Sequence, residues 1–316
     1  MAIFKDYLEN KSPLILHGAL GTEMESLGYD ISGKLWSAKY LLEKPEVIQK
    51  IHETYVAAGS DLITTSSYQA TLPGLIDAGL TKEEAEQIIA LTVQLAKDAR
   101  DKVWATLDET EKAKRPYPLI SGDVGPYAAY LANGSEYTGD YGQITIKELK
   151  EFHRPRIQIL LDQGVDLLAL ETIPNRLEAQ ALVELLAEEF PEAEAYISFT
   201  VQVPDAISDG TSLEEVAELV SRSEQILALG INCSSPILYD QALTILKNVG
   251  KSLITYPNSG EVYDGSTQTW KPKDKDALTL VEHSKDWHDQ FGVKILGGCC
   301  RTRPNDIKAL YTEFRT

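Results

Sequence analysis

Several features are scarce or missing in this chain of 316 residues. Basic residues are too few to balance the acidic ones, and the formal net charge of −18 at pH 7 argues against nucleic acid or an anionic membrane surface as a partner. No apolar stretch approaches the roughly 18 residues of a membrane span. Residues 1–11 are mixed and charged, without the apolar core of a signal peptide. These absences predict a cytoplasmic protein that binds neither nucleic acid nor a membrane.

Cysteine is also scarce, because the chain contains only Cys233, Cys299 and Cys300. The count is odd and two of the residues are adjacent, so we expect no disulfide framework. Each cysteine follows shortly after an apolar run and so stands where a strand is expected to end. Their chemistry therefore has to be considered together with the fold.

Short apolar runs alternate with helix-like segments eight times along the chain. Continuous apolar runs are typical of strands that are buried on both faces of a parallel sheet. Eight strand–helix units close into a barrel, so we predict an α/β fold with a single (β/α)8 TIM-type barrel domain, 1–316. An open doubly wound sheet is disfavoured because no G-x-G-x-x-G motif follows the first strand. The expected strands are 14–18, 61–65, 118–121, 166–170, 195–200, 225–229, 252–256 and 293–296.

The sequence makes specific predictions for two of the segments that connect strands. Thr81 and Glu84 have the spacing of a capping box, which predicts a long helix from there to about Asp108. The segment after the seventh strand, through Trp270, is expected to be a long loop.

All three cysteines follow strands at the end of the barrel where active sites are built. A lone cysteine is most often a small buried hydrophobic residue. Adjacent cysteines could also form a redox pair, but such a ring is strained and the C-x-x-C spacing is missing. Three thiols that converge at one place instead predict a zinc site formed by Cys233, Cys299 and Cys300. Three protein ligands leave one coordination position open, as in catalytic zinc sites.

The predicted donor set has a consequence for chemistry. Three thiolates on zinc give a centre of net charge −1, which activates water poorly but can hold a fourth thiolate. Binding to the metal lowers the pKa of a substrate thiol, so the predicted reaction is alkyl transfer to sulfur. A sulfonium methyl donor suits it, because an anionic thiolate and a cationic sulfonium cancel their charges, which a dry site favours.

The motifs at these positions resemble those of the homocysteine S-methyltransferase family. The family has a glycine-rich turn after the first strand, a G-x-N-C loop after the sixth and G-G-C-C near the C-terminus. The corresponding segments here are 18–23 (GALGTE), 230–233 (GINC) and 297–300 (GGCC), and further similar segments are 66–70 (SSYQA), 125–141 and 171–174 (ETIP).

The resemblance implies a zinc-containing (β/α)8 barrel that methylates homocysteine to methionine, with one zinc ion on the three cysteines. The 134–137 loop (GSEY) and the chain length are most similar to bacterial and plant enzymes that use S-methylmethionine or S-adenosylmethionine. Both donors stay open, as does a selenol or related thiol acceptor. From the chain length we expect no folate or cobalamin domain, and so not a cobalamin-dependent methionine synthase. The sequence has neither a heptad pattern nor a long apolar surface stretch, so it does not indicate the oligomeric state.

The resemblance also implies roles for single residues. Glu171 is expected to hold the amino group of homocysteine, and backbone N–H groups of the glycine-rich turn to receive its carboxylate. The acceptor-site residues implied are Gly18, Ala19, Leu20, Thr64, Glu171 and Asn232. The aromatic candidates for a wall around the sulfonium are Trp36, Tyr68 and Tyr127, each of which could also be simple packing.

One position departs from the family pattern. Where the family usually has an aspartate, directly before the glycine-rich turn, this chain has His17. A neutral imidazole cannot offset an ammonium group as a carboxylate does. We therefore expect His17→Asp to tighten homocysteine binding if the amine is normally held there.

Two other functions stay open. Gly297 and Gly298 could form a phosphate-binding loop after the eighth strand, an arrangement common in barrels, although this leaves the cysteines unexplained. A zinc- or thiol-binding barrel with little turnover is the other alternative, for which His17 is the support.

Overall fold

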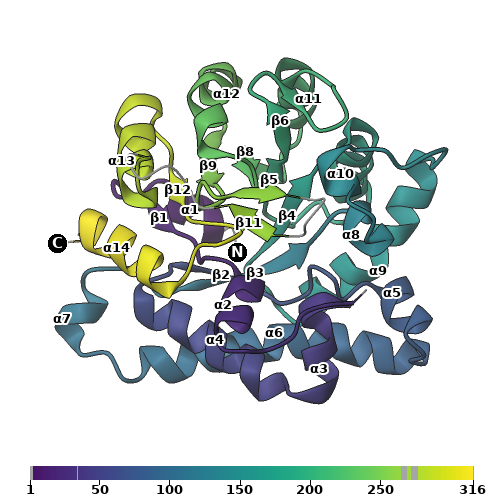
Figure 1. Cartoon of the computed structure of the whole chain (residues 1–316), viewed down its shortest axis with the longest axis horizontal. Coiled ribbons are helices and arrows are strands. Elements are labelled where there is room, and N and C mark those ends of the chain that lie inside the picture. Colours follow the sequence, from purple (N-terminus) through teal and green to yellow (C-terminus); the bar gives the residue numbers. More distant parts are fainter. Residues whose placement is uncertain (1–2, 34, 265–268, 272–276, 316) are drawn as a thin grey trace.

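The computed structural model describes residues 3–33, 35–264, 269–271 and 277–315. Eight parallel strands run through the centre of the molecule, with helices around them (Figure 1). The order of neighbouring strands is β1-β12-β9-β8-β5-β4-β3-β2. Their bounds are β1 (Leu14–Ile15), β2 (Leu62–Thr64), β3 (Leu119–Val124), β4 (Leu167–Ile173), β5 (Ala195–Phe199), β8 (Ile226–Asn232), β9 (Ser252–Tyr256) and β12 (Ile295–Leu296).

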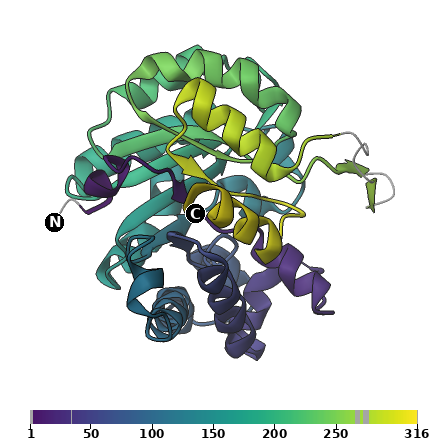
Figure 2. The same cartoon turned by 90° about the vertical axis from the view of Figure 1, so that its left-hand side faces the viewer.

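Helices connect the strands and cover the outside of the barrel (Figures 1 and 2). Within the described ranges, none of them is long and apolar enough to span a membrane. The α-helices are α1 (Ile3–Leu8), α2 (Leu20–Ser26), α3 (Lys39–Glu43), α4 (Pro45–Ala58), α5 (Leu72–Asp77), α6 (Lys82–Trp104), α7 (Glu109–Lys112), α8 (Tyr127–Leu131), α9 (Ile146–Asp162), α10 (Arg176–Glu189), α11 (Leu213–Ser221), α12 (Tyr239–Leu246), α13 (Leu280–Phe291) and α14 (Pro304–Arg315). Single 3-10 turns are η1 (Trp36–Ala38), η2 (Ser135–Tyr137), η3 (Pro236–Leu238) and η4 (Lys247–Val249).

The sheet closes on itself between β1 and β2. A parallel bridge joins Leu16 to Leu62, and the N–H of Asp61 donates to the carbonyl of Ile15 at 2.6 Å. The buried carboxylate of Asp61 accepts one hydrogen bond from the N–H of Ile15 at 2.9 Å and another from Arg315 at 2.7 Å. Because Arg315 lies on α14, this ion pair attaches the last helix to the junction of β1 and β2, which we call the seam of the barrel.

Alternate strand residues point into the barrel and fill it. Phe4 and Leu8 of α1 join this interior cluster, and the N–H of Phe4 donates to Glu194 just before β5, so α1 covers the N-terminal end of the barrel. The strand period of two means that the next inward-facing residues toward the C-terminal ends are polar, among them Thr64, Asp123 and Glu171, and we call them the polar layer. The apolar interior consists of Leu14, Leu16, Leu62, Leu119, Leu167, Ala169, Tyr196, Ala228, Ile254, Tyr256 and Ile295.

The prediction of eight parallel strands in a barrel is confirmed, but three strands continue further than expected. β3, β4 and β8 extend to Val124, Ile173 and Asn232. The sequence pattern ended each of them where the apolar run stopped. Hydrogen bonding between backbones continues past that point because it does not depend on apolar side chains. The extensions carry Asp123, Glu171 and Asn232 within the sheet.

Two connections differ from the expectations. Helix α6 ends at Trp104, because Asp108 accepts a hydrogen bond from the N–H of Glu111 and so caps α7 instead of continuing the longer helix. The expected loop after the seventh strand contains an antiparallel pair, β10 (Val262–Asp264) and β11 (Thr269–Lys271), which projects from the body in Figure 2. The rest of that expected loop, 265–268, lies outside the described residues. A second pair, β6 (Val201–Val203) with β7 (Ala206–Ile207), was not expected either.

The seam at Asp61 gives a stability prediction. The side chains of Asp61 and Arg315 are 0% and 5% exposed, so Arg315→Leu leaves a buried carboxylate without its cation. We expect the free energy of unfolding to fall by about 3 kcal/mol, measured by urea denaturation at pH 7. The matched control is Arg154→Leu, which breaks a surface pair with Glu189 at 37% exposure and should cost less than about 1 kcal/mol. Equal, small losses in both variants would show that the buried pair does not hold the seam.

Candidate active site

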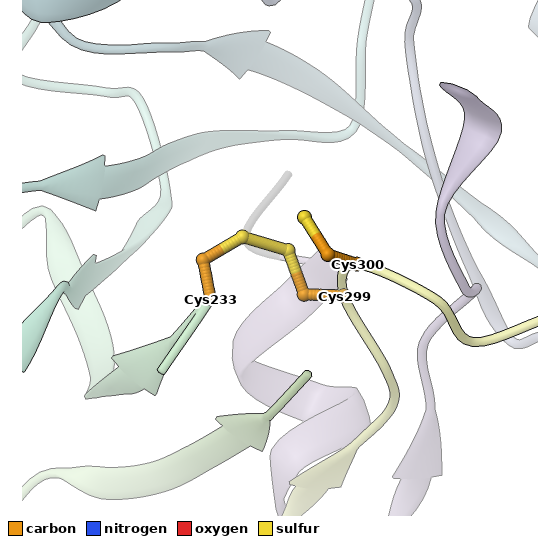
Figure 3. A group of neighbouring side chains, drawn as sticks. All are labelled: Cys233, Cys299 and Cys300. Atoms are coloured by element: carbon orange, nitrogen blue, oxygen red, sulfur yellow. A yellow bond between two sulfur atoms is a disulfide. The ribbon is translucent and has the colours of Figure 1, made fainter. Parts of the chain in front are cut away.

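The three cysteines lie together at the C-terminal end of the barrel, on the loops after β8 and β12 (Figure 3). Their sulfur atoms all lie within 4.8 Å of one another. The sheet order explains the meeting, because β9 is the single strand between β8 and β12. The structure thus brings together Cys233, Cys299 and Cys300 from positions that are far apart in the sequence.

The last residue of β9 and the loop after it hold both cysteine loops in place. The N–H of Cys233 donates to the carbonyl of Tyr256 at 3.2 Å, and the N–H of Cys299 donates to the carbonyl of Pro257 at 2.7 Å. The side-chain amide of Asn258 donates to the carbonyl of Cys233 at 3.1 Å. Asn258 follows the seventh expected strand, 252–256, and no role was predicted for it; an amide beside Pro257 at a strand end was the available signal.

A disulfide joins Cys233 to Cys299, with their Cα atoms 5.3 Å apart, and Cys300 is a free thiol. We expected no disulfide framework, and the structure contains this single bond, which was not predicted. The odd count and the adjacent pair argued against a framework, but they do not exclude a bond between loops 66 residues apart that the barrel brings together. Thiolates are the metal ligands, so this pair has to be reduced before it can bind a metal.

The three sulfur atoms fit a soft metal ion. Zinc–sulfur bonds of about 2.3 Å in a tetrahedral site keep the ligands about 3.8 Å apart. All three sulfurs lie within 4.8 Å of one another, and the bonded pair Cys233–Cys299 has to be reduced and to separate to reach that spacing. Burial raises the pKa of the Cys300 thiol to about 11. A bound cation would reverse that effect by favouring the thiolate. The cluster can therefore hold a metal through three protein ligands.

Glu171 lies on β4 in the polar layer above the apolar interior. The hydroxyl of Tyr256 donates to its Oε2 at 3.1 Å, and Ser198 hydrogen-bonds the same hydroxyl. Its carboxyl group is also hydrogen-bonded to that of Asp123 on β3. Burial raises the pKa of Glu171 to about 7. Tyr256 connects this carboxylate to the metal site, because its carbonyl binds the N–H of Cys233.

Asn232 is the last residue of β8, and its amide is directed at Thr172. Its Oδ1 accepts from the N–H of Thr172 at 3.1 Å, and its Nδ2 donates to the hydroxyl of Thr172 at 2.8 Å. Thr172 has a φ of +65°, a left-handed conformation that is strained for a β-branched residue. Asn232 therefore stabilises the turn of chain directly after Glu171.

Thr64 lies at the end of β2 and is buried. Its hydroxyl hydrogen-bonds the hydroxyl of Ser121 on β3 at 3.0 Å. By strand period, Thr64 stands in the polar layer of the barrel.

The glycine-rich turn lies between β1 and α2. The N–H of Ala19 donates to the carbonyl of Thr302 at 3.3 Å, and the carbonyl of Ala19 accepts from the hydroxyl of Tyr55 at 3.0 Å. A Cβ on Gly18 would lie 3.0 Å from polar atoms of these same two side chains, so the turn is tightly enclosed. Leu20 begins α2. The turn is thus fastened to the loop that carries the double cysteine.

The imidazole of His17 packs against α4. Its ring centroid lies 5.9 Å from that of Tyr55, and its Nδ1 lies 2.5 Å from the carbonyl of Gly18. Burial lowers the pKa of His17, so the ring is neutral at pH 7. The contact with Gly18 assigns His17 to the ordering of the turn, and the effect of His17→Asp on homocysteine affinity stays a prediction.

The three aromatic candidates occupy different surroundings. Tyr68 lies near Glu171 and its hydroxyl hydrogen-bonds Thr172, which places it at the polar layer. Trp36 is on η1 and is 48% exposed. Tyr127 is on α8 with its ring packed edge-on against Phe152 of α9, on the outer side of the barrel wall. The structure therefore brings Tyr68, but neither of the other two, into contact with the residues around Glu171.

The comparison with known proteins agrees with this geometry. The sequence model of one family, described as homocysteine S-methyltransferase, matches residues 14–314. The chain belongs to this family. The matched range includes all eight barrel strands and the three cysteines, so the family and the fold expected from the sequence are both confirmed.

Relatives in the family are similar over nearly their whole length. Homocysteine S-methyltransferase YbgG of Bacillus subtilis is 45% identical over 305 residues, which is 96% of this chain and 95% of that protein. The metallated form of the homocysteine methyltransferase MmuM from Escherichia coli superposes with a TM-score of 0.86 at 40% identity, covering 98% of this chain and 99% of that chain. The oxidized form of MmuM has a TM-score of 0.84 at 40% identity, covering 97% of both chains.

Glu171 gives a pH-dependent prediction for stability. Because its pKa is raised to about 7 from an ordinary 4.5, the folded state holds more protons than the unfolded state between those pH values. Stability therefore falls as the pH rises through this window. Glu171→Gln has no proton to lose and keeps an acceptor for Tyr256. It should raise the free energy of unfolding at pH 8 by about 1 to 3 kcal/mol and change it little at pH 4.5.

The measurement is thermal and urea unfolding of reduced, metal-free protein at both pH values. Glu189→Gln, which alters a surface carboxylate paired with Arg154, is the control and should not stabilise the protein at pH 8. A loss of stability in Glu171→Gln at pH 8 would contradict the prediction.

Proposed function

We propose that this protein transfers a methyl group from a sulfonium donor, S-methylmethionine or S-adenosylmethionine, to the thiol of homocysteine, giving methionine. The observation that carries the proposal is the cluster of three cysteine sulfurs within 4.8 Å at the C-terminal end of a barrel. Membership of the homocysteine S-methyltransferase family supports the acceptor.

Cys233, Cys299 and Cys300 would together hold one zinc ion, with one coordination position left for the acceptor. Zinc bound there would lower the pKa of the acceptor thiol, so that the thiol is a thiolate near neutral pH. The end of β9 and the residue after it fix the cysteine backbones, since Tyr256 and Pro257 accept from the N–H groups of Cys233 and Cys299.

The reaction balances without a further co-reactant. The acceptor thiolate attacks the methyl carbon, a sulfur–carbon bond forms, and the bond from that carbon to the sulfonium sulfur breaks with its electron pair. The donor leaves as a neutral thioether. One negative and one positive charge disappear, so exclusion of water by the barrel mouth favours the step.

The acceptor pocket in this proposal lies between the metal site and the strand ends. Glu171 binds the ammonium group, and Tyr256 orients Glu171 by its hydrogen bond of 3.1 Å. Backbone groups at Gly18, Ala19 and Leu20 receive the carboxylate. Thr64 and Asn232 line the pocket, the latter by holding the turn after Glu171.

The donor pocket would use aromatic side chains that tolerate a cation. Tyr68 is the candidate that the geometry favours, because it lies beside the polar layer. Trp36 and Tyr127 are the other two candidates. We further propose that residues 1–316 form one homocysteine-binding barrel domain and that the protein works in the cytoplasm.

The phosphate-binding alternative finds little support at the loop after β12. Arg301 is paired with Glu261 through its Nε at 2.5 Å, and Arg303 is paired with Glu23 at 2.9 Å. Both cations near Gly297 and Gly298 therefore already have carboxylate partners.

Parallel assays with two donors test the proposed function. Reduced, zinc-loaded protein should form methionine from homocysteine with S-methylmethionine or S-adenosylmethionine, and the two rates identify the preferred donor. Removal of zinc with a chelator should lower the rate by at least about a hundredfold, because the metal supplies several kcal/mol of activation, and added zinc should restore it. If zinc-loaded protein forms no methionine with either donor, the proposal fails and a zinc- or thiol-binding barrel with little turnover takes its place.

A further inference from the structure

A second buried carboxylate lies next to Glu171. Asp123 pairs with Ala169 in the register of β3 and β4, so Glu171, two residues further along β4, points to the same face. The carboxyl groups of Asp123 and Glu171 are hydrogen-bonded to each other. Asp123 is 3% exposed, and its Oδ1 has no hydrogen-bond partner. One oxygen of the pair is therefore free to accept a donor from a ligand.

The nearby guanidinium does not satisfy this pair. Arg156 of α9 directs its Nη1 to the carbonyls of Ser67 and Tyr68, at 3.2 and 3.1 Å, and its Nη2 to the carbonyl of Gly125 at 2.5 Å. Its positive charge favours the ionised form of Asp123, but burial and the charge of Glu171 outweigh it and raise the pKa of Asp123.

Two adjacent buried carboxyl groups are unfavourable unless a cation or a shared proton compensates them. A ligand with an ammonium group would supply both the charge and the donors, and charge-assisted hydrogen bonds of this kind are strong. The same acceptor must place its sulfur at the cysteines. Tyr256 lies between the carboxylates and the cysteines, because its hydroxyl donates to Glu171 and its carbonyl accepts from the N–H of Cys233.

We propose that Asp123 and Glu171 together bind the ammonium group of homocysteine, with Asp123 as the second carboxylate of the amine pocket. This inference rests on the proposed methylation of homocysteine. The ring of His17 packs against Tyr55 of α4. Asp123 is then a specificity-determining residue that selects amino-acid thiols over thiols without an amine.

The test compares two acceptors in the reduced, zinc-loaded protein: homocysteine and 4-mercaptobutanoate, which lacks only the amino group. In Asp123→Asn, the KM for homocysteine should rise about ten- to a hundredfold with kcat much less affected, as expected for loss of one charge-assisted contact. The kcat/KM for 4-mercaptobutanoate should stay within about twofold of wild type. Asp123→Ser repeats the test with a smaller neutral side chain, in case the asparagine variant folds poorly.

The matched control is Asp166→Asn, which removes the same charge at the opposite end of the β3–β4 pair. Asp166 accepts from the N–H of Ile120 at 2.7 Å, and an asparagine oxygen can keep that bond. This variant should retain the homocysteine KM of wild type. A homocysteine KM within twofold of wild type in folded Asp123→Asn, or an equal loss for both acceptors, would overturn the inference. Failure of wild-type protein to methylate homocysteine would instead overturn the proposed function.

Discussion

The pairing of β9 with both β8 and β12 is the constraint on which the site depends. β8 and β9 approach so closely that a Cβ on Gly230 would lie 1.7 Å from the carbonyl oxygen of Ile254. Tyr256 at the end of β9 accepts a hydrogen bond from the N–H of Cys233 on one side, and Pro257 directly after it accepts one from the N–H of Cys299 on the other. Backbone hydrogen bonds of the sheet and its loops therefore position the cysteine backbones, in addition to the disulfide that joins Cys233 to Cys299.

Tyr256 extends this frame to the substrate pocket. Its carbonyl accepts from the N–H of Cys233 and its hydroxyl donates to Glu171, so one residue links a metal-site loop to the carboxylate proposed to bind the ammonium group. The pocket stores unfavourable energy, because Asp123 and Glu171 are held together away from water. Groups arranged for a ligand commonly destabilise the free protein in this way. Binding of a cation recovers part of that cost and makes it available for affinity and selectivity.

Much of the fold and the metal site could be predicted from the sequence, because apolar runs mark buried strands and three cysteines are few enough to place. Contacts between polar side chains could not be predicted. The link from Tyr256 to Glu171, the pairing of Asn232 with Thr172 and the carboxyl pair at Asp123 join different strands. They depend on strand register, and strands that are buried on both faces have continuous apolar runs with no alternation from which the register could be read. The Cys233–Cys299 disulfide was not predicted, although the three thiols were expected to converge, because the odd cysteine count and the adjacent pair argued against a disulfide framework.

The central claim is that three protein thiolates hold zinc and leave one position for the sulfur of the acceptor. X-ray absorption at the zinc edge of the reduced, zinc-loaded protein tests it most directly, because sulfur neighbours appear at about 2.3 Å. We expect three sulfur ligands and one lighter atom without substrate, and four sulfur ligands after homocysteine is added. A lighter fourth ligand that persists with homocysteine bound, or four sulfur ligands already present without it, would contradict the account.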